Sequence, residues 1–368
     1  MNITFVVPEL NSSGGTRVIS KYAHALKEAG HQVCIVIWKE SPRGVRNVLR
    51  HYLLRFLGKV VDNQHNWYFE DNSVPIIDLG FSKLISERRL PDADVVIATF
   101  YSTALGVARL SSRKGRKYYF MQDYGAPGQT LDVVAPTWYF PMHIITISQF
   151  LVDLVKQARP TAAVTLIPNS VEFDVFRSDR RNKQPTPTFG VMYRLLHTKG
   201  SQAAFESFKR VLKQYPDARL LVVGHESLDA QLPPNSTASG SIADDALAKV
   251  YASCDAWLFP SEAEGFGLPI LEAMACRTPV ISTPAGAAPE LLAQIGCLVP
   301  VDDPNAMAEA MIDVIKLTNE EWMDMSDRSY ERAIMWHWTD AVDQFAQTLH
   351  GNHSGGHAGL GKQAARHS

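Results

Sequence analysis

The sequence predicts an α/β fold built from two doubly wound parallel sheets that follow one another along the chain. The chain has 368 residues, which is too long for one ordinary domain. Short apolar runs alternate with helical patterns, which indicates parallel strands buried on both faces. A polar, proline-bearing stretch at 177–187 separates two such series and is typical of a linker, so we predict domains at 1–176 and 177–336.

The elements of the first series follow in order. An apolar run at 3–7 is a strand, a glycine-containing turn follows it, and 17–29 has a helical pattern. The remaining strands of this series are expected at 33–38, 95–99, 118–121, 144–147 and 164–167.

The second series repeats the pattern. Helices are expected at 202–214 and 243–252. Strands are expected at 188–191, 220–223, 256–259, 280–282 and 297–299. Ligands of such sheets bind beyond the carboxyl ends of the strands, so two facing domains are expected to form a binding cleft.

Composition narrows the class of function. Hydrophobic residues make up 46% of the chain, charged residues 20%, and the net charge is -2, which favours a soluble globular protein without a global preference for nucleic acid. The 4 cysteines form no CxxC pair and are expected to be free thiols in a reducing compartment. The amino terminus lacks the regions of a signal peptide, and we expect a cytoplasmic protein.

The strongest candidate for chemistry is a loop with two glycines at 260–267. Phe259 ends an expected strand before it, and Pro269 suits the first turn of a helix after it. The N–H groups at such a helix start can bind a diphosphate or sugar hydroxyls. The carboxylates of Glu264 and Glu272 can reach the same cleft and accept vicinal hydroxyls of a ribose or a hexose. An ordinary turn with solvated glutamates is the alternative.

A basic pair lies after the expected strand at 188–191. Arg194 and Lys199 precede a helix, where they can neutralise a diphosphate, the arginine as a bidentate fork. Two solvated side chains in a loop are the alternative.

The segment from Glu264 to Glu272 resembles the E-x7-E signature of glycosyltransferase family 4, the retaining group with the GT-B fold. The flanking segments 240–255 and 272–286 resemble the family as well, and the similarity covers nearly the whole chain. The resemblance implies two Rossmann-like domains that face each other across a cleft, with a last helix at about 337–350 packed back on the first domain. A disordered tail is expected at 351–368.

The resemblance also implies the reaction. A sugar moves from a nucleotide-diphosphate sugar to a saccharide or lipid-linked saccharide with retention, in the biosynthesis of a surface polysaccharide or glycoconjugate. The substitution takes place at the front face, and the leaving phosphate helps to deprotonate the acceptor. No Asp-x-Asp run accompanies the predicted site residues, so neither a metal nor a cofactor is expected.

The family pattern assigns roles to individual residues. Arg194 and Lys199 hold the pyrophosphate, Glu264 orients the sugar, and Glu272 contacts the ribose. Asp123 is placed near the transferred sugar or the acceptor hydroxyl. The predicted catalytic residues are Glu264, Arg194, Lys199 and Asp123. The residues predicted to bind the donor are Gly14, Gly15, Arg194, Lys199, Ile242, Glu264, Gly265, Phe266, Gly267, Leu268 and Glu272.

Two turns of the first domain bear on the substrates. Gly14 and Gly15 let the backbone approach donor phosphates or the acceptor, with a plain turn as the alternative. Gln122 and Asp123 follow a strand where many family members have a histidine. This departure is similar to some deoxysugar transferases, including rhamnosyltransferase-like members. Gly224 begins a turn that resembles a family turn but lacks its last glycine.

Residues 41–61 carry five basic side chains and no acid, interleaved with apolar ones at helical spacing. Such a stretch can lie on an anionic membrane or hold a lipid-linked acceptor, and a helix packed on its own domain is the alternative. We therefore expect peripheral membrane contact through 43–61, at the inner face, and no nucleic acid. A sugar-nucleotide epimerase of the same fold and an inactive nucleotide-sugar-binding protein are the competing functions.

Overall fold

The computed structural model describes residues 1–11, 13–40, 67–69, 73–124, 131–194, 196–224 and 232–351. These residues form two compact units. The N-terminal unit holds the described residues within Met1–Ile147, Leu151–Ile167 and Val342–His353, and the C-terminal unit holds those within Ser148–Phe150 and Pro168–Ala341. The basic stretch at 41–61, most of the tail predicted at 351–368 and part of the turn after Gly224 lie outside the described residues.

The N-terminal unit is built on a seven-stranded sheet in the order β3-β2-β1-β4-β5-β6-β7. Every neighbouring pair of strands is parallel. The strands are β1 (Asn2–Val7), β2 (Gln32–Glu40), β3 (Ile76–Ser82), β4 (Val95–Ala98), β5 (Arg116–Met121), β6 (His143–Thr146) and β7 (Val164–Leu166).

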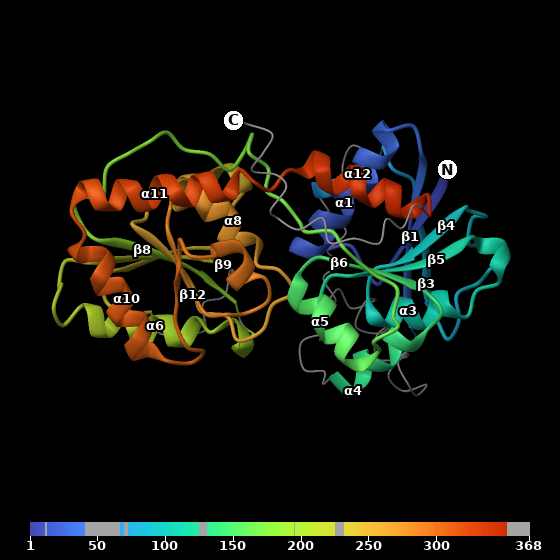
Figure 1. Ribbon diagram of the computed structural model, residues 1–368, viewed down its shortest axis with the longest axis horizontal. Helices are drawn as coiled ribbons and strands as arrows, with labels where there is room; N and C mark the ends of the chain where they lie inside the picture. The colour runs from blue at the N-terminus through green and yellow to red at the C-terminus, as the bar shows by residue number, and fades with distance from the viewer. Residues whose placement is uncertain are drawn as a thin grey trace, which may run out of the picture. The chain divides into compact units, whose positions relative to one another are not determined.

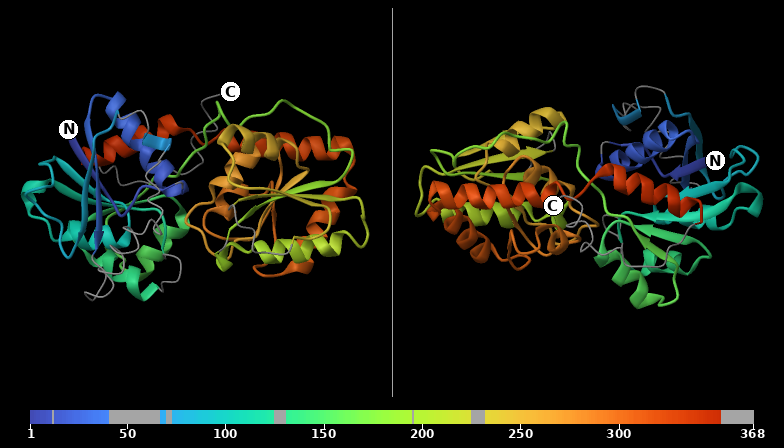
Figure 2. Two further views of the ribbon diagram at one scale, coloured as in Figure 1. Left: turned by 180° about the vertical axis from the view of Figure 1, so that it is seen from behind. Right: turned by 45° about the horizontal axis from the view of Figure 1, so that its top comes forward.

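Helices cover both faces of this sheet, as a doubly wound fold requires. Figure 1 shows α1 and α12 on one face and α3, α4 and α5 on the other, and the turned views in Figure 2 show the same layers. The helices are α1 (Gly14–Glu28), α3 (Tyr101–Ala108), α4 (Leu131–Val134), α5 (Gln149–Ala158) and α12 (Trp338–Leu349), with short 3₁₀ turns η1 (Trp67–Phe69), η2 (Ser112–Lys114) and η3 (Ala135–Tyr139).

Helix α12 closes the N-terminal core although it comes from the far end of the chain. Phe345 is fully buried and stacks on Tyr22 of α1 with 4.3 Å between ring centroids. The same ring meets Phe120 of β5 edge-on at 5.3 Å. The Tyr118 hydroxyl donates to the Thr348 carbonyl oxygen at 3.0 Å, so both apolar and polar contacts fix this helix to the unit.

The C-terminal unit is built on a six-stranded sheet in the order β10-β9-β8-β11-β12-β13, again with parallel neighbours. Helices α8 and α11 cover one face in Figure 1, and α6 and α10 cover the other. The strands are β8 (Thr188–Tyr193), β9 (Arg219–Gly224), β10 (Ser236–Ser239), β11 (Ala256–Phe259), β12 (Val280–Ser282) and β13 (Cys297–Leu298). The helices are η4 (His197–Lys199), α6 (Ser201–Val211), α7 (Asp244–Ala252), α8 (Leu268–Ala275), α9 (Ala288–Leu292), α10 (Pro304–Lys316) and α11 (Asn319–Ala333).

The predicted fold class, two Rossmann-like parallel-sheet domains, is confirmed. Each predicted strand is present with small shifts at its ends, and β3 and β10 are strands that the sequence did not reveal. Within the described part of the chain, no helix combines the length and the apolar character needed to cross a bilayer.

Candidate functional site

The two loops that carry the predicted chemistry of the C-terminal unit lie side by side. Strands β8 and β11 are parallel neighbours, so their carboxyl ends share one edge of the sheet. The loop after β8 contains Thr198, whose carbonyl oxygen accepts a hydrogen bond from the Glu262 amide at 2.8 Å, in the loop after β11. His197 Nδ1 also lies 3.3 Å from a Glu262 carboxylate oxygen. The backbone therefore fixes the spacing of the two loops.

A glycine makes this close approach possible. Gly200 ends the β8 loop with φ of 65°, and a Cβ atom at this position would lie 2.0 Å from the carbonyl oxygen of Pro260. Only a residue without a side chain fits there without moving one of the loops.

The close approach brings together Lys199 and Glu264, both predicted site residues. The Lys199 ammonium lies 2.8 Å from Glu264 Oε1, with side-chain exposures of 27% and 19%. Ser261 Oγ donates to the same carboxylate oxygen at 2.9 Å. The site thus holds one partly exposed cation and one partly exposed anion at the carboxyl edge of the sheet.

Arg194 begins the same loop, directly after β8. Its side chain is exposed, and its Nη2 lies 3.1 Å from the Met192 sulfur. Its amide donates to the hydroxyl of Ser201, the first residue of α6, at 3.3 Å. A second cation therefore stands at the edge that carries Lys199.

Helix α8 begins at the same edge. Gly267 caps it with φ of 106°, and a Cβ atom there would come within 3.3 Å of the Phe259 ring and 3.2 Å of the Ile270 side chain. Gly265 and Phe266 are buried and Leu268 is half-buried. Pro269 has no N–H group and the Ile270 amide donates to the Gly267 carbonyl oxygen at 2.9 Å, so the positive end of the helix dipole is what adds anion-binding capacity beside Glu264.

Glu272 occupies a different environment from Glu264. It lies in α8 with an exposure of 3%, and the hydroxyl of buried Tyr251 in α7 donates to its Oε2 at 2.9 Å. Ile242 is half-buried just before α7. The predicted contact of Glu272 with a ribose stays a prediction, and the geometry adds Tyr251 as the partner of this carboxylate.

In the N-terminal unit, the glycine turn is fixed by polar side chains. Gly14 and Gly15 form the first turn of α1, and the Gly15 carbonyl oxygen accepts from Gln122 Nε2 at 3.2 Å. Asn11 Oδ1 accepts from the Ser13 amide at 3.0 Å and steadies the turn from the other side. The structure therefore joins this turn to the end of β5.

Asp123 follows Gln122 in the loop after β5. Its side chain is exposed, and Oδ1 accepts from the Tyr124 amide at 2.7 Å. This places a carboxylate at the carboxyl edge of the N-terminal sheet, in the unit that does not contain Arg194, Lys199 and Glu264.

The opposite edge of the C-terminal sheet carries a buried polar anchor. Asp255 accepts hydrogen bonds from the amides of Gln184 and Thr188, both at 2.8 Å. Burial raises the pKa of Asp255, while these amides and the nearby Arg181 oppose that effect. Burial likewise raises the pKa of Cys276 to about 12, so this thiol stays protonated and inert at neutral pH.

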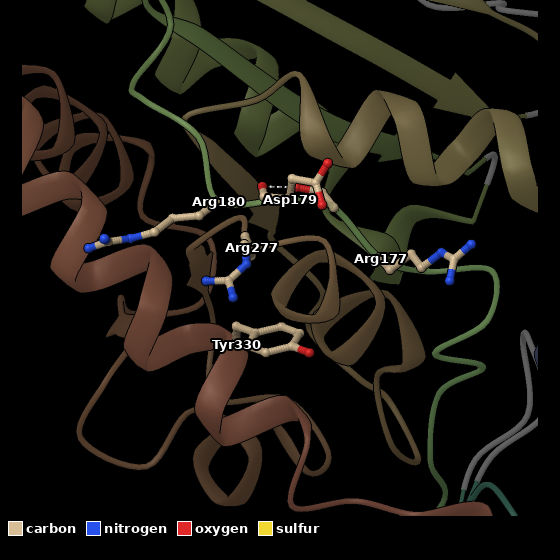
Figure 3. Close-up of a pocket in the computed structure, with 6 residues that line it drawn as sticks. Arg177, Asp179, Arg180, Arg277 and Tyr330 are labelled. Atoms are coloured by element: carbon tan, nitrogen blue, oxygen red, sulfur yellow. Dashed lines mark hydrogen bonds between the residues drawn. The ribbon is translucent and has the colours of Figure 1, made fainter.

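A solvent-open pocket of about 560 Å³ also lies at that opposite edge (Figure 3). Arg277 stands in the middle of it, 4.2 Å from the ring centroid of Tyr330. Asp327 accepts from Arg277 at 2.5 Å and from Arg180 at 2.8 Å, so one carboxylate pairs with two of the arginines. Because Arg277 precedes β12, the pocket is distinct from the edge that carries Lys199 and Glu264.

No group of three or more His, Cys, Asp or Glu side chains within the described ranges is arranged to hold a metal ion. Metal-independent chemistry stays a prediction.

Comparison with known proteins relates this part of the chain to glycosyl transferases. Residues 186–316 match the family of glycosyl transferases group 1, and they include both loops and α8. A phosphatidyl-myo-inositol mannosyltransferase of Mycobacterium tuberculosis is 30% identical over 190 residues, which cover 47% of this chain and 50% of the relative. The chain thus spans about half the length of the curated relatives it matches.

Solved structures extend the likeness to the whole fold. HepE of Anabaena, solved with UDP-glucose, has a TM-score of 0.73 at 18% identity, covering 95% of this chain and 100% of that one. Sucrose-phosphate synthase of Thermosynechococcus elongatus has a TM-score of 0.71 at 18% identity, covering 96% and 99%. The chain therefore has the fold of the GT-B glycosyltransferases, and its C-terminal unit carries a region similar to the group 1 transferases.

Proposed function

We propose that this protein is a retaining glycosyltransferase. It moves a hexosyl or deoxyhexosyl group from a nucleotide-diphosphate sugar to a saccharide or lipid-linked acceptor. One observation carries the proposal: the adjacent loops after β8 and β11 place Lys199 and Glu264 2.8 Å apart at the edge that also carries Arg194 and the start of α8. Cations for a diphosphate and a carboxylate for sugar hydroxyls are then in one place.

The cations serve the leaving group. As the bond between the anomeric carbon and the phosphate oxygen breaks, negative charge grows on the diphosphate. Arg194, Lys199 and the positive end of the α8 dipole stabilise that charge, and fixed charges and dipoles of this kind supply much of the rate enhancement in comparable enzymes.

Glu264 serves the sugar. Its carboxylate accepts hydrogen bonds from ring hydroxyls and holds the anomeric carbon in place while an oxocarbenium-like state forms. The acceptor oxygen attacks the face that the diphosphate leaves, and the acceptor proton passes to the departing phosphate oxygen. The anomeric configuration is retained without a covalent enzyme intermediate.

The names of the relatives narrow the substrates to be tried first. A mannosyltransferase acting on phosphatidyl-myo-inositol and a GDP-mannose-dependent mannosyltransferase are among them, and HepE was solved with UDP-glucose. We propose a hexose donor and a membrane-lipid or lipid-linked acceptor, handled at the cytoplasmic face of the membrane. The deoxyhexose suggested by Gln122 and Asp123 is the third donor to test.

Thermal unfolding with GDP-mannose, UDP-glucose and dTDP-rhamnose tests donor binding. A ligand that binds only the folded state raises the melting temperature, about 2.7 kcal/mol of stabilisation being expected at a hundredfold excess over Kd. One donor should do so in the wild type, and Arg194→Ala should abolish the shift. If all three donors leave the melting temperature unchanged, the proposed donor class is wrong.

Product analysis tests the reaction. NMR of the product formed from the selected donor and a lipid-linked acceptor should show the anomeric configuration of the donor. Glu264→Ala should lower the rate by at least about a hundredfold, comparable to the loss of a fixed transition-state donor. Transfer at the wild-type rate would remove Glu264 from the site, and an epimerised nucleotide sugar formed without acceptor would point to the competing enzyme class.

A further inference from the structure

We propose that Ser261 is the positioning residue of Glu264. Its hydroxyl keeps the carboxylate aimed at the donor sugar when Lys199 leaves the carboxylate for the donor diphosphate. This inference rests on the proposed function. Of the described partners of Glu264, Lys199 moves when the donor binds and Ser261 stays in place.

Both partners contact the same oxygen of Glu264. Lys199 Nζ lies 2.8 Å from Oε1, and Ser261 Oγ lies 2.9 Å from it. The ammonium supplies the charge and the hydroxyl supplies a second hydrogen bond. A carboxylate that loses the ammonium still keeps a donor.

Thr283 holds the backbone of Ser261 in place. Ser261 has an exposure of 3%, and its carbonyl oxygen accepts a hydrogen bond from the Thr283 hydroxyl. Thr283 directly follows β12, has an exposure of 1%, and its amide donates to the Phe259 carbonyl oxygen at 3.0 Å. The hydroxyl of Ser261 therefore belongs to the rigid edge of the sheet.

The Lys199 side chain is free enough to change partners. Its side chain is 27% exposed, and within the described part of the chain its ammonium makes, besides the ion pair, a long contact of 3.4 Å to the Ala263 carbonyl oxygen. A flexible four-carbon stem with three rotatable donors can change partners at small cost. A diphosphate bears more negative charge than one carboxylate, so donor binding draws the ammonium toward it.

The movement of Lys199 from Glu264 to the diphosphate predicts different effects on the binding of a nucleotide sugar and of a nucleoside diphosphate. Ser261 acts on the sugar through Glu264 and has no part in holding the diphosphate. Ser261→Ala should therefore weaken the nucleotide sugar about tenfold, the loss of one hydrogen bond to a charged group. The affinity for the nucleoside diphosphate alone should stay unchanged. Lys199→Met should weaken both ligands.

Isothermal titration with the selected nucleotide sugar and with its nucleoside diphosphate measures both affinities. Ser282→Ala is the matched control, because that serine is equally buried at the neighbouring strand end and donates to the Thr283 carbonyl oxygen. It should leave both affinities unchanged. In a Glu264→Ala background, which removes the acceptor, Ser261→Ala should cause no further loss, because the two residues act as one unit.

Two results would overturn the inference: an unchanged affinity of Ser261→Ala for the nucleotide sugar, or an equal loss for both ligands, which would indicate a collapsed loop. If Ser261→Ala does not fold, Ser261→Cys keeps the size, offers only a weak donor and should show the same selective loss. Failure of the proposed function looks different, because Glu264→Gln would then bind and transfer like the wild type.

Discussion

At the residue scale, Gly200 sets the distance between the loops of the candidate site. Its φ of 65° is strained for any residue with a side chain, and its Cα faces the Pro260 carbonyl oxygen. The contact between Lys199 and Glu264 depends on that distance. The glycine thus contributes to chemistry without touching a substrate.

Gly200→Ala should destabilise the C-terminal unit by more than about 2 kcal/mol, because backbone strain of about 1–2 kcal/mol adds to a steric clash. Donor affinity should fall as well. Gly30→Ala is the control, since Gly30 has φ of 85° and nothing within 4 Å of the added Cβ. Urea unfolding of both variants checks the difference, and equal losses would show that the clash is relieved locally.

Asp123 permits a separate test at the residue scale. Asp123→Asn should lower the transfer rate by at least about a hundredfold, the usual size of a general-base or orienting contribution. Nucleoside diphosphate should still raise the melting temperature as in the wild type, because Arg194 and Lys199 belong to the other unit. A variant that transfers normally would exclude Asp123 from the reaction.

The sequence predicted part of the candidate site. Lys199 and Glu264 were both named from their place after strands, and the structure brings them into contact. Ser261 and Tyr251 were missed, because a buried hydroxyl that supports a carboxylate leaves no charge and no spacing in the sequence. The burial of Glu272 was missed for a related reason. The sequence places Glu272 one turn into a helix, but the exposure of its side chain depends on the packing of α7 against α8.

At the element scale, the two strands that the sequence did not reveal are both edge strands. β3 begins at Ile76 and β10 at Ser236, and each ends the strand order of its sheet. A central strand of a parallel sheet is buried on both faces and therefore has a continuous apolar run. An edge strand has one neighbour and more exposed positions, so it can lack such a run, as β3 and β10 do. The edge strands β7 and β13 lie in short apolar runs and were predicted.

Helix α11 is started by a capping box. Thr318 Oγ1 accepts from the Glu321 amide at 3.2 Å, and Glu321 Oε2 accepts from the Thr318 amide at 2.8 Å. Thr318→Ala should lower the free energy of unfolding by about 1 kcal/mol, the typical value for a lost N-cap. Thr318→Ser, which keeps the hydroxyl, should stay close to the wild type in urea unfolding.

The capping box also predicts a pH dependence. The hydrogen bond from the Thr318 amide lowers the pKa of Glu321 below its ordinary value of 4.5. Its contribution to stability is therefore present above that value and is lost as the pH falls through the lowered pKa. Glu321→Gln should be less stable than the wild type at pH 7, and the difference should shrink toward pH 3. A difference that is independent of pH would contradict this assignment.

At the scale of the whole molecule, each unit has a core of its own. The C-terminal core gathers around Phe189, Phe205 and Trp322. The N-terminal core includes Phe345, although this residue follows the C-terminal unit in the sequence. The amphipathic pattern of the last helix could be read from the sequence, but its partners could not, because they lie in strands and helices more than two hundred residues earlier.

Two separate cores predict two unfolding transitions in calorimetry, since multidomain chains depart from two-state behaviour. Phe345→Ala should lower one transition, and Phe205→Ala should lower the other, each by about 3–5 kcal/mol in unit stability because a buried ring is removed. Both residues are fully buried, so each variant serves as the control for the other. Nucleoside diphosphate should raise only the transition that Phe205→Ala lowers, because the diphosphate contacts belong to the C-terminal unit. If calorimetry shows one transition that both substitutions lower and the ligand raises, the two units unfold together, coupled by α12.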